Sequence, residues 1–316
     1  MTRLDESSII NIFQNRLGKK KFVSEDVEIF NLGKIKIVAK TDTLVESTDI
    51  PPKMKLSDAA RKSIVACVSD FAAKGVKPKY GIISINLPKT ISRSKINEIA
   101  SGFRKACDDY NISILGGDTN EGKEIVFNVC IFGTTDKIVT RKGSKNGDIV
   151  FVTGPFGYTS AGLNMLLGKK KGKESFTKKS IKSVINPKPK LDFGLKNKKY
   201  FSSSMDSSDG LSTTLNEMSK QSKNKFVINN MPAMKDLEGF AKSQKLNLDD
   251  LIFHGGEEYE FIFTTSPKHR NIIEKNAKMC KTPIIEIGHV TSGKGVFVEK
   301  HDSVVRLKDL GWKHFR

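Results

Sequence analysis

The chain has 316 residues, of which 37% are hydrophobic and 28% are charged. This balance is typical of one large or two ordinary globular domains and excludes an intrinsically disordered chain. No apolar run reaches the roughly 18 residues that a membrane span requires, and we expect no signal peptide. The four cysteines are far apart and show no CxxC spacing. They therefore predict reduced thiols in a cytoplasmic protein, not disulfides or a zinc site.

The charge is strongly unbalanced, with 54 basic and 35 acidic residues and a net charge of +19. Such a surface attracts either nucleic acid or small polyanions such as nucleotides. Lysines are concentrated between Gly168 and Tyr200, where aromatic residues and arginine are scarce. Lysine alone is poorly suited to reading bases. We therefore favour a solvated surface over a nucleic-acid site.

Segments typical of strands and helices alternate along the first half of the chain. A strand over Lys34–Ala39 runs into Thr41-Asp42, and a helix is predicted from an N-cap at Ser57 to Gly75. The further predicted elements are a strand over Tyr80–Leu87, a helix over Ser94–Tyr110, and strands over Ile112–Leu115, Ile125–Phe132 and Ile149–Thr153.

The second half continues in the same style after a turn-rich stretch at Gly143–Asp148. It contains predicted helices at Ala161–Leu167 and Leu211–Ser219 and predicted strands at Glu260–Thr264 and Ile284–Ile287. The pattern predicts an α/β or α+β protein with two abutting domains, residues 1–145 and 146–316.

Several common catalytic motifs are absent. No GxxxxGK[ST], GxGxxG, HExxH or GxSxG occurs, and Asp192-Phe193-Gly194 lacks the HRD and VAIK segments of a protein kinase. These absences argue against a P-loop enzyme, a protein kinase, a zinc peptidase and a serine hydrolase.

Acidic residues do stand beside strand ends, helices and glycine turns in five short segments. The segments are Thr41-Asp42-Thr43, Ser69–Ala73, Gly116–Thr119, Asp206–Gly210 and Gly255–Glu260. Any one alone is explained by turn formation or helix capping. If the carboxylates converge, each close pair repels by about 4 kcal/mol at 4 Å, so a cation must neutralise them. Oxygen ligands without cysteine or histidine favour Mg²⁺ or Ca²⁺.

The order of these motifs resembles the thiamine-monophosphate kinases. The resemblance runs from about residue 22 to 315 through KTDTLVEST, VSDFAAKGVKP, ILGGDTNEG, TRKGSKNGD, VTGPFG, MDSSDGLS, HGGEEYEFIFTT and GWKHF. It implies the fold of aminoimidazole ribonucleotide synthetase, with N-terminal sheets that pair in a homodimer. It also implies a reaction in which ATP and thiamine monophosphate give ADP and thiamine diphosphate.

The resemblance also implies roles for individual residues. Arg141 and Asp206 would be catalytic, and several magnesium ions would be held by Asp26, Thr41, Asp42, Asp70, Asp118, Asp206 and Asp209. ATP would contact Tyr110, Gly117, Asp118, Arg141 and Ser208. Thiamine monophosphate would contact Glu257 and Trp312, and Asp49 lies in a segment expected near the substrate. Tyr110 equally continues an apolar helical stripe, and Trp312 equally fits an anchor for the C-terminus.

A phosphate monoester has a second pKa near 6, so the acceptor is already ionised at neutral pH and needs no strong base. The difficulty is to bring two polyanions together, which Mg²⁺ and Arg141 would relieve while holding them in line.

The chain departs from the family pattern at Lys40, where Ser or Thr is common, and at Asp49, where His is usual. Ser24-Glu25-Asp26 and Glu258 also differ. Two alternatives therefore stay open. One is a related ATP enzyme with another acceptor, and the other is a catalytically impaired binding protein that uses its lysine-rich segment.

Overall fold

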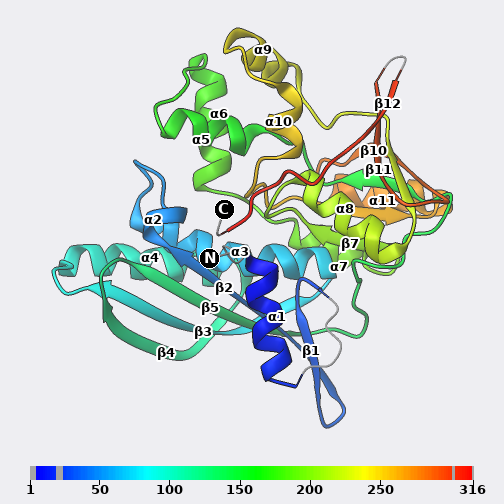
Figure 1. Cartoon of the computed structure of the whole chain (residues 1–316). Coiled ribbons are helices and arrows are strands. Elements are labelled where there is room, and N and C mark those ends of the chain that lie inside the picture. Colours follow the sequence, from blue (N-terminus) through cyan, green and yellow to red (C-terminus); the bar gives the residue numbers. More distant parts are fainter. Residues whose placement is uncertain (1–4, 19–23, 301–302, 315–316) are drawn as a thin grey trace.

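The computed structural model describes residues 5–18, 24–300 and 303–314. It has an α/β architecture with two separate sheets, one of five strands and one of seven (Figure 1). Within the described residues, no helix is both long and apolar enough to cross a membrane. Residues 22, 23 and 315, at the ends of the segment that resembles the kinases, lie outside the described residues.

The first sheet is built from the N-terminal part of the chain, in the order β1-β2-β5-β3-β4. Only the β3–β4 pair is parallel. The strands are β1 (Glu28–Leu32), β2 (Ile35–Val45), β3 (Lys77–Pro88), β4 (Ser113–Gly122) and β5 (Val126–Thr134). β2 and β4 continue past the predicted strand ends at Ala39 and Leu115, so Asp42 and Asp118 lie within strands and not after them.

Two long helices, α3 (Leu56–Lys74) and α4 (Arg93–Tyr110), pack against each other. Gly75 ends α3 in the left-handed conformation at φ 65°, as the sequence predicts. The predicted N-cap is wrong, because Lys55 holds that position without a side-chain cap and Ser57 lies inside the helix. Two short helices, α1 (Glu6–Arg16) and α2 (Glu46–Asp49), complete this part of the chain.

α3 covers one face of the first sheet, and the other face is open in the described part of this chain. Every residue of β4 except Gly122 is exposed. Large apolar side chains also lie exposed on the strands, including Tyr80 at 48%, Ile82 at 39% and Leu115 at 64%. An apolar sheet face of this kind is typical of an interaction surface.

The second sheet has the order β12-β11-β8-β10-β6-β9-β7. Only β8 and β11 pair in parallel. The strands are β6 (Ile149–Val152), β7 (Ser203–Asp206), β8 (Lys225–Ile228), β9 (Phe261–Thr265), β10 (Ile285–Thr291), β11 (Gly295–Lys300) and β12 (Ser303–Arg306).

The remaining elements of the second half are helices. They are α5 (Tyr158–Leu166), α6 (Glu174–Ile185), α7 (Leu191–Asn197), α8 (Leu211–Ser222), α9 (Lys235–Ser243), α10 (Leu248–Phe253), the 3₁₀ turn η1 (Pro267–His269) and α11 (Arg270–Met279).

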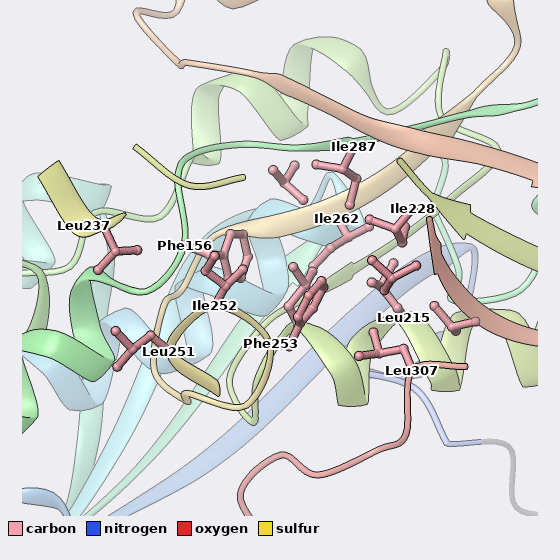
Figure 2. Packing of buried hydrophobic residues seen from close by; sticks show 14 of the residues in the cluster. Phe156, Leu215, Ile228, Leu237, Leu251, Ile252, Phe253, Ile262, Ile287 and Leu307 are labelled. Carbon is pink, nitrogen blue, oxygen red and sulfur yellow. The ribbon is translucent and has the colours of Figure 1, made fainter. Parts of the chain in front are cut away.

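The core of the second half joins the sheet to its helices. Figure 2 shows Phe253 of α10 and Leu215 of α8 packed with Ile228 and Ile262 of the sheet. Burying each such side chain contributes about 1.5–3 kcal/mol. This core holds β7 and the start of α8 in place, and the segment between them carries Asp206 and Asp209.

The lysine-rich stretch is part of the same fold. α6 and α7 form within it, and they bury Phe176 and Phe193. Many of its lysines are exposed, as expected for a solvated surface.

Helix α3 lies between the two halves. It contacts β2 and β5 of the first sheet and β7, β9 and α7 of the second half. Because it is covered on all sides, nearly every residue from Ala59 to Lys74 is buried. Among its polar residues, Asp70 lies between the two halves, beside Lys40 of β2 and Asp206 of β7.

Candidate active site

Three aspartates from distant parts of the chain converge beside α3. Asp26 precedes β1, Asp70 lies on α3, and Asp206 ends β7. Each offers one carboxylate oxygen, and these atoms lie within 4.8 Å of one another. The three residues are only 3–4% exposed. Asp70 and Asp206 belong to the acidic motifs considered as candidates for convergence, and Asp26 was added by the family resemblance.

Asp42 joins the group through Lys40. Both residues lie on β2 and point to the face that α3 covers, since residues two apart on a strand share a face. Lys40 Nζ lies 2.9 Å from Asp70 Oδ2 and 3.5 Å from Asp42 Oδ1. We call Asp26, Asp42, Asp70 and Asp206 the aspartate cluster.

Two more basic residues hold Asp26. Lys74 Nζ lies 2.8 Å from Asp26 Oδ2 and 2.9 Å from Glu25 Oε2, and it donates a hydrogen bond to the Ser204 carbonyl. Arg141 donates from Nε and from its terminal nitrogen to Asp26 Oδ1. Lys74 is fully buried. It was not predicted, because a lysine in the last turn of a helix looks like an ordinary solvated C-terminal residue.

The electrostatics divide the cluster into two parts. Burial would raise the pKa of Asp26, but Lys74 and Arg141 outweigh it, so the pKa of this carboxyl is lowered. Burial first and the Asp206 charge second hold the pKa of Asp70 well above its usual range. Burial also raises the pKa of Asp206 to about 7, and the Asp26 charge adds to this. Burial raises the pKa of Asp42 as well, so the charged form is disfavoured at Asp42, Asp70 and Asp206 and favoured only at Asp26.

The donor set fits magnesium. Mg²⁺ binds oxygen ligands at about 2.1 Å in octahedral geometry, which places neighbouring ligand oxygens about 3–4 Å apart. The oxygens of Asp26, Asp70 and Asp206 lie within 4.8 Å of one another, so small side-chain movements would bring them to this spacing. Ser69 Oγ donates to Asp206 Oδ2 at 3.1 Å and orients this carboxylate. Cys67 lies nearby, but burial raises the pKa of its thiol well above normal, so it offers no thiolate.

A second group of predicted residues lies on three adjoining loops. The Glu257 amide donates to the Ser208 carbonyl at 2.6 Å, and the Trp312 amide donates to the Asp209 carbonyl at 2.9 Å. Gly256 permits the first contact, since a Cβ there would lie 2.7 Å from the Ser208 oxygen. Trp312 is 58% exposed. The backbone thus joins these four residues next to Asp206.

Asp49 does not present a free carboxylate to these loops. Its Oδ2 accepts a hydrogen bond from the Val45 amide at 2.7 Å, within the short helix α2. Its carbonyl faces Lys62 Nζ at 3.5 Å, and Lys62 in turn forms an ion pair with Glu257. Lys62 thus contacts two of the predicted substrate residues, and the sequence motifs did not indicate it.

Asp118, Gly117 and Thr41 lie apart from the aspartate cluster. Across the sheet, Thr41 pairs with Cys130, and Asp118 pairs with Ser84. Successive residues of a strand point to opposite faces, and the row of Asp42 across the sheet lies between the rows of Thr41 and Asp118. Because Asp42 points toward α3, Thr41 and Asp118 belong to the open face of the sheet. Gly117 is on the helix side, where a Cβ would lie 1.7 Å from the Ile83 carbonyl.

Tyr110 packs against the apolar cluster of α3 and the first sheet, as the helical stripe predicts. Its hydroxyl accepts a hydrogen bond from Arg61 at 3.3 Å. Arg61 also donates to the Pro187 carbonyl at 3.0 Å. These contacts fix Tyr110 between the two halves of the chain.

Comparison with known proteins places this geometry in a family. The family described as AIR synthase related protein, N-terminal domain, matches residues 24–135. A thiamine-monophosphate kinase of Nitrosopumilus maritimus is 69% identical over the full length of both chains. The enzyme of the same name from Aquifex aeolicus is 31% identical over 100% of this chain and 99% of its own.

A solved structure agrees with this relation. AaThiL complexed with AMPPCP and TMP has a TM-score of 0.87 and 30% identity, and the match covers 100% of this chain and 98% of that one. Fold, motif order and full-length similarity agree. The chain belongs to the thiamine-monophosphate kinase family.

Proposed function

We propose that this protein transfers the γ-phosphoryl group of ATP to the phosphate of thiamine monophosphate, giving ADP and thiamine diphosphate. The observation that carries the proposal is the convergence of Asp26, Asp70 and Asp206 within 4.8 Å. The names of its relatives and the ligands of AaThiL, an ATP analogue and TMP, point to the same reaction.

The transfer is proposed to be direct and in line. Several Mg²⁺ ions, when bound, would neutralise the phosphates and the developing charge. The aspartate cluster, together with Asp209, would hold ions on one face of the sheet, and Thr41 and Asp118 would hold an ion on the other face. The acceptor phosphate is already ionised, so no residue has to act as a strong base.

Arg141 and the loop residues would position the nucleotide. Arg141 is held by Asp26 and by Ser24 Oγ at 2.7 Å. A cation on Asp26 would weaken that hold and leave guanidinium donors for phosphate oxygens. Ser208, Gly117, Asp118 and Tyr110 complete the proposed ATP contacts.

The thiamine moiety is proposed to contact Glu257 and Trp312. Trp312 is largely exposed and is tied by its backbone to Asp209, so its ring is available beside the phosphate end of the site. An indole ring can stack on a cationic heterocycle such as thiazolium. Asp49 is proposed to shape this region through its carbonyl contact with Lys62.

We further propose a homodimer in which the open faces of the first sheets pair. Tyr80, Ile82 and Leu115 supply exposed apolar area for such an interface. This arrangement would also place Asp118 and Thr41 at the dimer interface, because both lie on the face that would be covered. We propose a cytoplasmic location, in keeping with four free cysteines in the described chain.

The reaction is tested by incubating purified protein with thiamine monophosphate and Mg-ATP. We expect ADP and thiamine diphosphate in equal amounts, and no product in excess EDTA. ADP and free phosphate without thiamine diphosphate would contradict the proposed acceptor. A screen of other phosphorylated acceptors by ATP consumption would then identify the true one.

A further inference from the structure

Lys40 pairs with two members of the aspartate cluster, Asp42 and Asp70. Its side chain is 22% exposed, and Nζ lies between Asp70 Oδ2 at 2.9 Å and Asp42 Oδ1 at 3.5 Å. Asp42 and Asp70 come from β2 and α3. One ammonium group thus bridges two carboxylates from two separate elements, which is the arrangement expected of a bound cation.

The other two basic residues of the site serve a different carboxylate. Lys74 and Arg141 both pair with Asp26. In the part of the chain that the structure describes, Lys40 is the one basic residue paired with Asp42 or Asp70. The positive charge that offsets the repulsion between Asp42 and Asp70 therefore comes from Lys40.

An ammonium group and a divalent ion compete for such a position. Two cations about 4 Å apart repel by about 4 kcal/mol per unit of charge product at an effective dielectric near 20. An ion bound between Asp42 and Asp70 would have to displace Lys40.

We propose that the Lys40 ammonium takes the place of one divalent cation, the one that would otherwise bridge Asp42 and Asp70. The inference rests on the proposed function only in that the aspartate cluster binds divalent ions. It assigns Lys40 a fixed electrostatic role and predicts that this chain holds one ion fewer than the same chain without that lysine.

The test is to count Mn²⁺ ions on the whole protein by titration, with the EPR signal of free Mn²⁺ as readout. The variants are Lys40→Ser and Lys40→Met, with Lys36→Ser as the matched control, since Lys36 is an exposed lysine of the same strand. We expect about one additional Mn²⁺ per chain in both Lys40 variants and no change in the control. Equal numbers of ions, with dissociation constants within about twofold of the wild type, would overturn the proposal.

The Lys40 variants leave Asp42 and Asp70 without their basic partner, which lowers stability. A second measurement therefore follows the folding of these variants. Thermal unfolding is followed in EDTA and at increasing Mg²⁺ concentration. We expect a lower Tm than wild type in EDTA and a larger gain with Mg²⁺, because the added ion replaces the lost charge. A Tm that falls equally with and without Mg²⁺ would also overturn it. Neither readout requires thiamine diphosphate formation, so a failure of the proposed reaction is recognised separately.

Discussion

Lys62 Nζ lies 2.5 Å from Glu257 Oε1, although the two residues belong to different halves of the chain. Lys62 comes from α3 and is 1% exposed. Glu257 has a left-handed backbone at φ 61°, which is uncommon for a residue with a side chain. A buried cation and a strained backbone together fix one carboxylate at the edge of the proposed thiamine subsite.

Removing this cation is expected to weaken binding of thiamine monophosphate. In Lys62→Met the aliphatic stem stays buried, but Glu257 loses the partner that orients it. We expect KM for thiamine monophosphate to rise by about tenfold, corresponding to about 1.4 kcal/mol, with KM for ATP changed much less. Steady-state kinetics with each substrate varied in turn measure both constants. Lys105→Met, an exposed lysine of α4, is the control and should match wild type.

Asp70 is expected to be required for activity. In the absence of divalent ions, we expect its carboxylate to lower the stability of the fold. Burial and the neighbouring Asp206 raise its pKa, so its charge is costly without a metal ion. Asp70→Asn should lower kcat by about 100-fold or more, because it removes an ion-holding carboxylate. In EDTA its Tm should equal or exceed that of wild type, while its gain with Mg²⁺ should be smaller.

Differential scanning calorimetry and the kinase assay together test this prediction. Asp108→Asn is the control, since Asp108 is an exposed acid of α4 paired with Arg104. A variant that loses stability in EDTA and keeps a full response to Mg²⁺ would show that Asp70 is structural and does not hold an ion.

Glu258 is expected to make stability depend on pH. It is buried, its Oε1 accepts a hydrogen bond from the Gly157 amide at 2.6 Å, and burial raises its pKa to about 7. Between the ordinary value of 4.5 and about 7, the folded protein binds more protons than the unfolded chain. The free energy of unfolding therefore falls as pH rises through this window, by up to about 3 kcal/mol.

Replacing Glu258 with Gln keeps an acceptor for Gly157 and removes the titration. Urea unfolding at pH 5 and pH 8 should show a smaller decrease for Glu258→Gln than for wild type. The exposed Glu238→Gln control should follow wild type. A decrease of the same size in all three proteins would assign the pH dependence to other groups.

The sequence predicted much of the fold and the central part of the site. The long helices α3 and α4 were recognisable because their apolar residues recur with helical spacing, and Gly75 marked where α3 ends. Asp70 and Asp206 were found because short acidic motifs interrupt apolar segments, and Asp26 was found only through the family resemblance. Several elements were not predicted, among them β1, α6, α9 and α11. α6 lies in the lysine-rich segment, which was interpreted as a solvated surface.

The remainder depends on contacts that only the folded chain reveals. Lys62 and Lys74 look like ordinary helix lysines in the sequence, and their partners Glu257 and Asp26 are 195 and 48 positions away. The placement of Asp118 on the open face depends on the register of β3 and β4. Strand register is set by long-range packing, which a local motif does not encode.

The open sheet face gives the last prediction. Ile82 lies on β3 in register with Cys130 and Gly116 across this face, and it is 39% exposed. If two copies pair through this surface, Ile82→Glu would bury two uncompensated charges and should convert the dimer to a monomer by light scattering. Ile96→Glu is the control, because Ile96 is similarly exposed on α4 and its replacement should not change the mass.

A dimer that survives Ile82→Glu would place the interface elsewhere. Loss of kinase activity in that monomer, with Tm unchanged, would indicate that Asp118 and Thr41 need the covered face to contribute to the site.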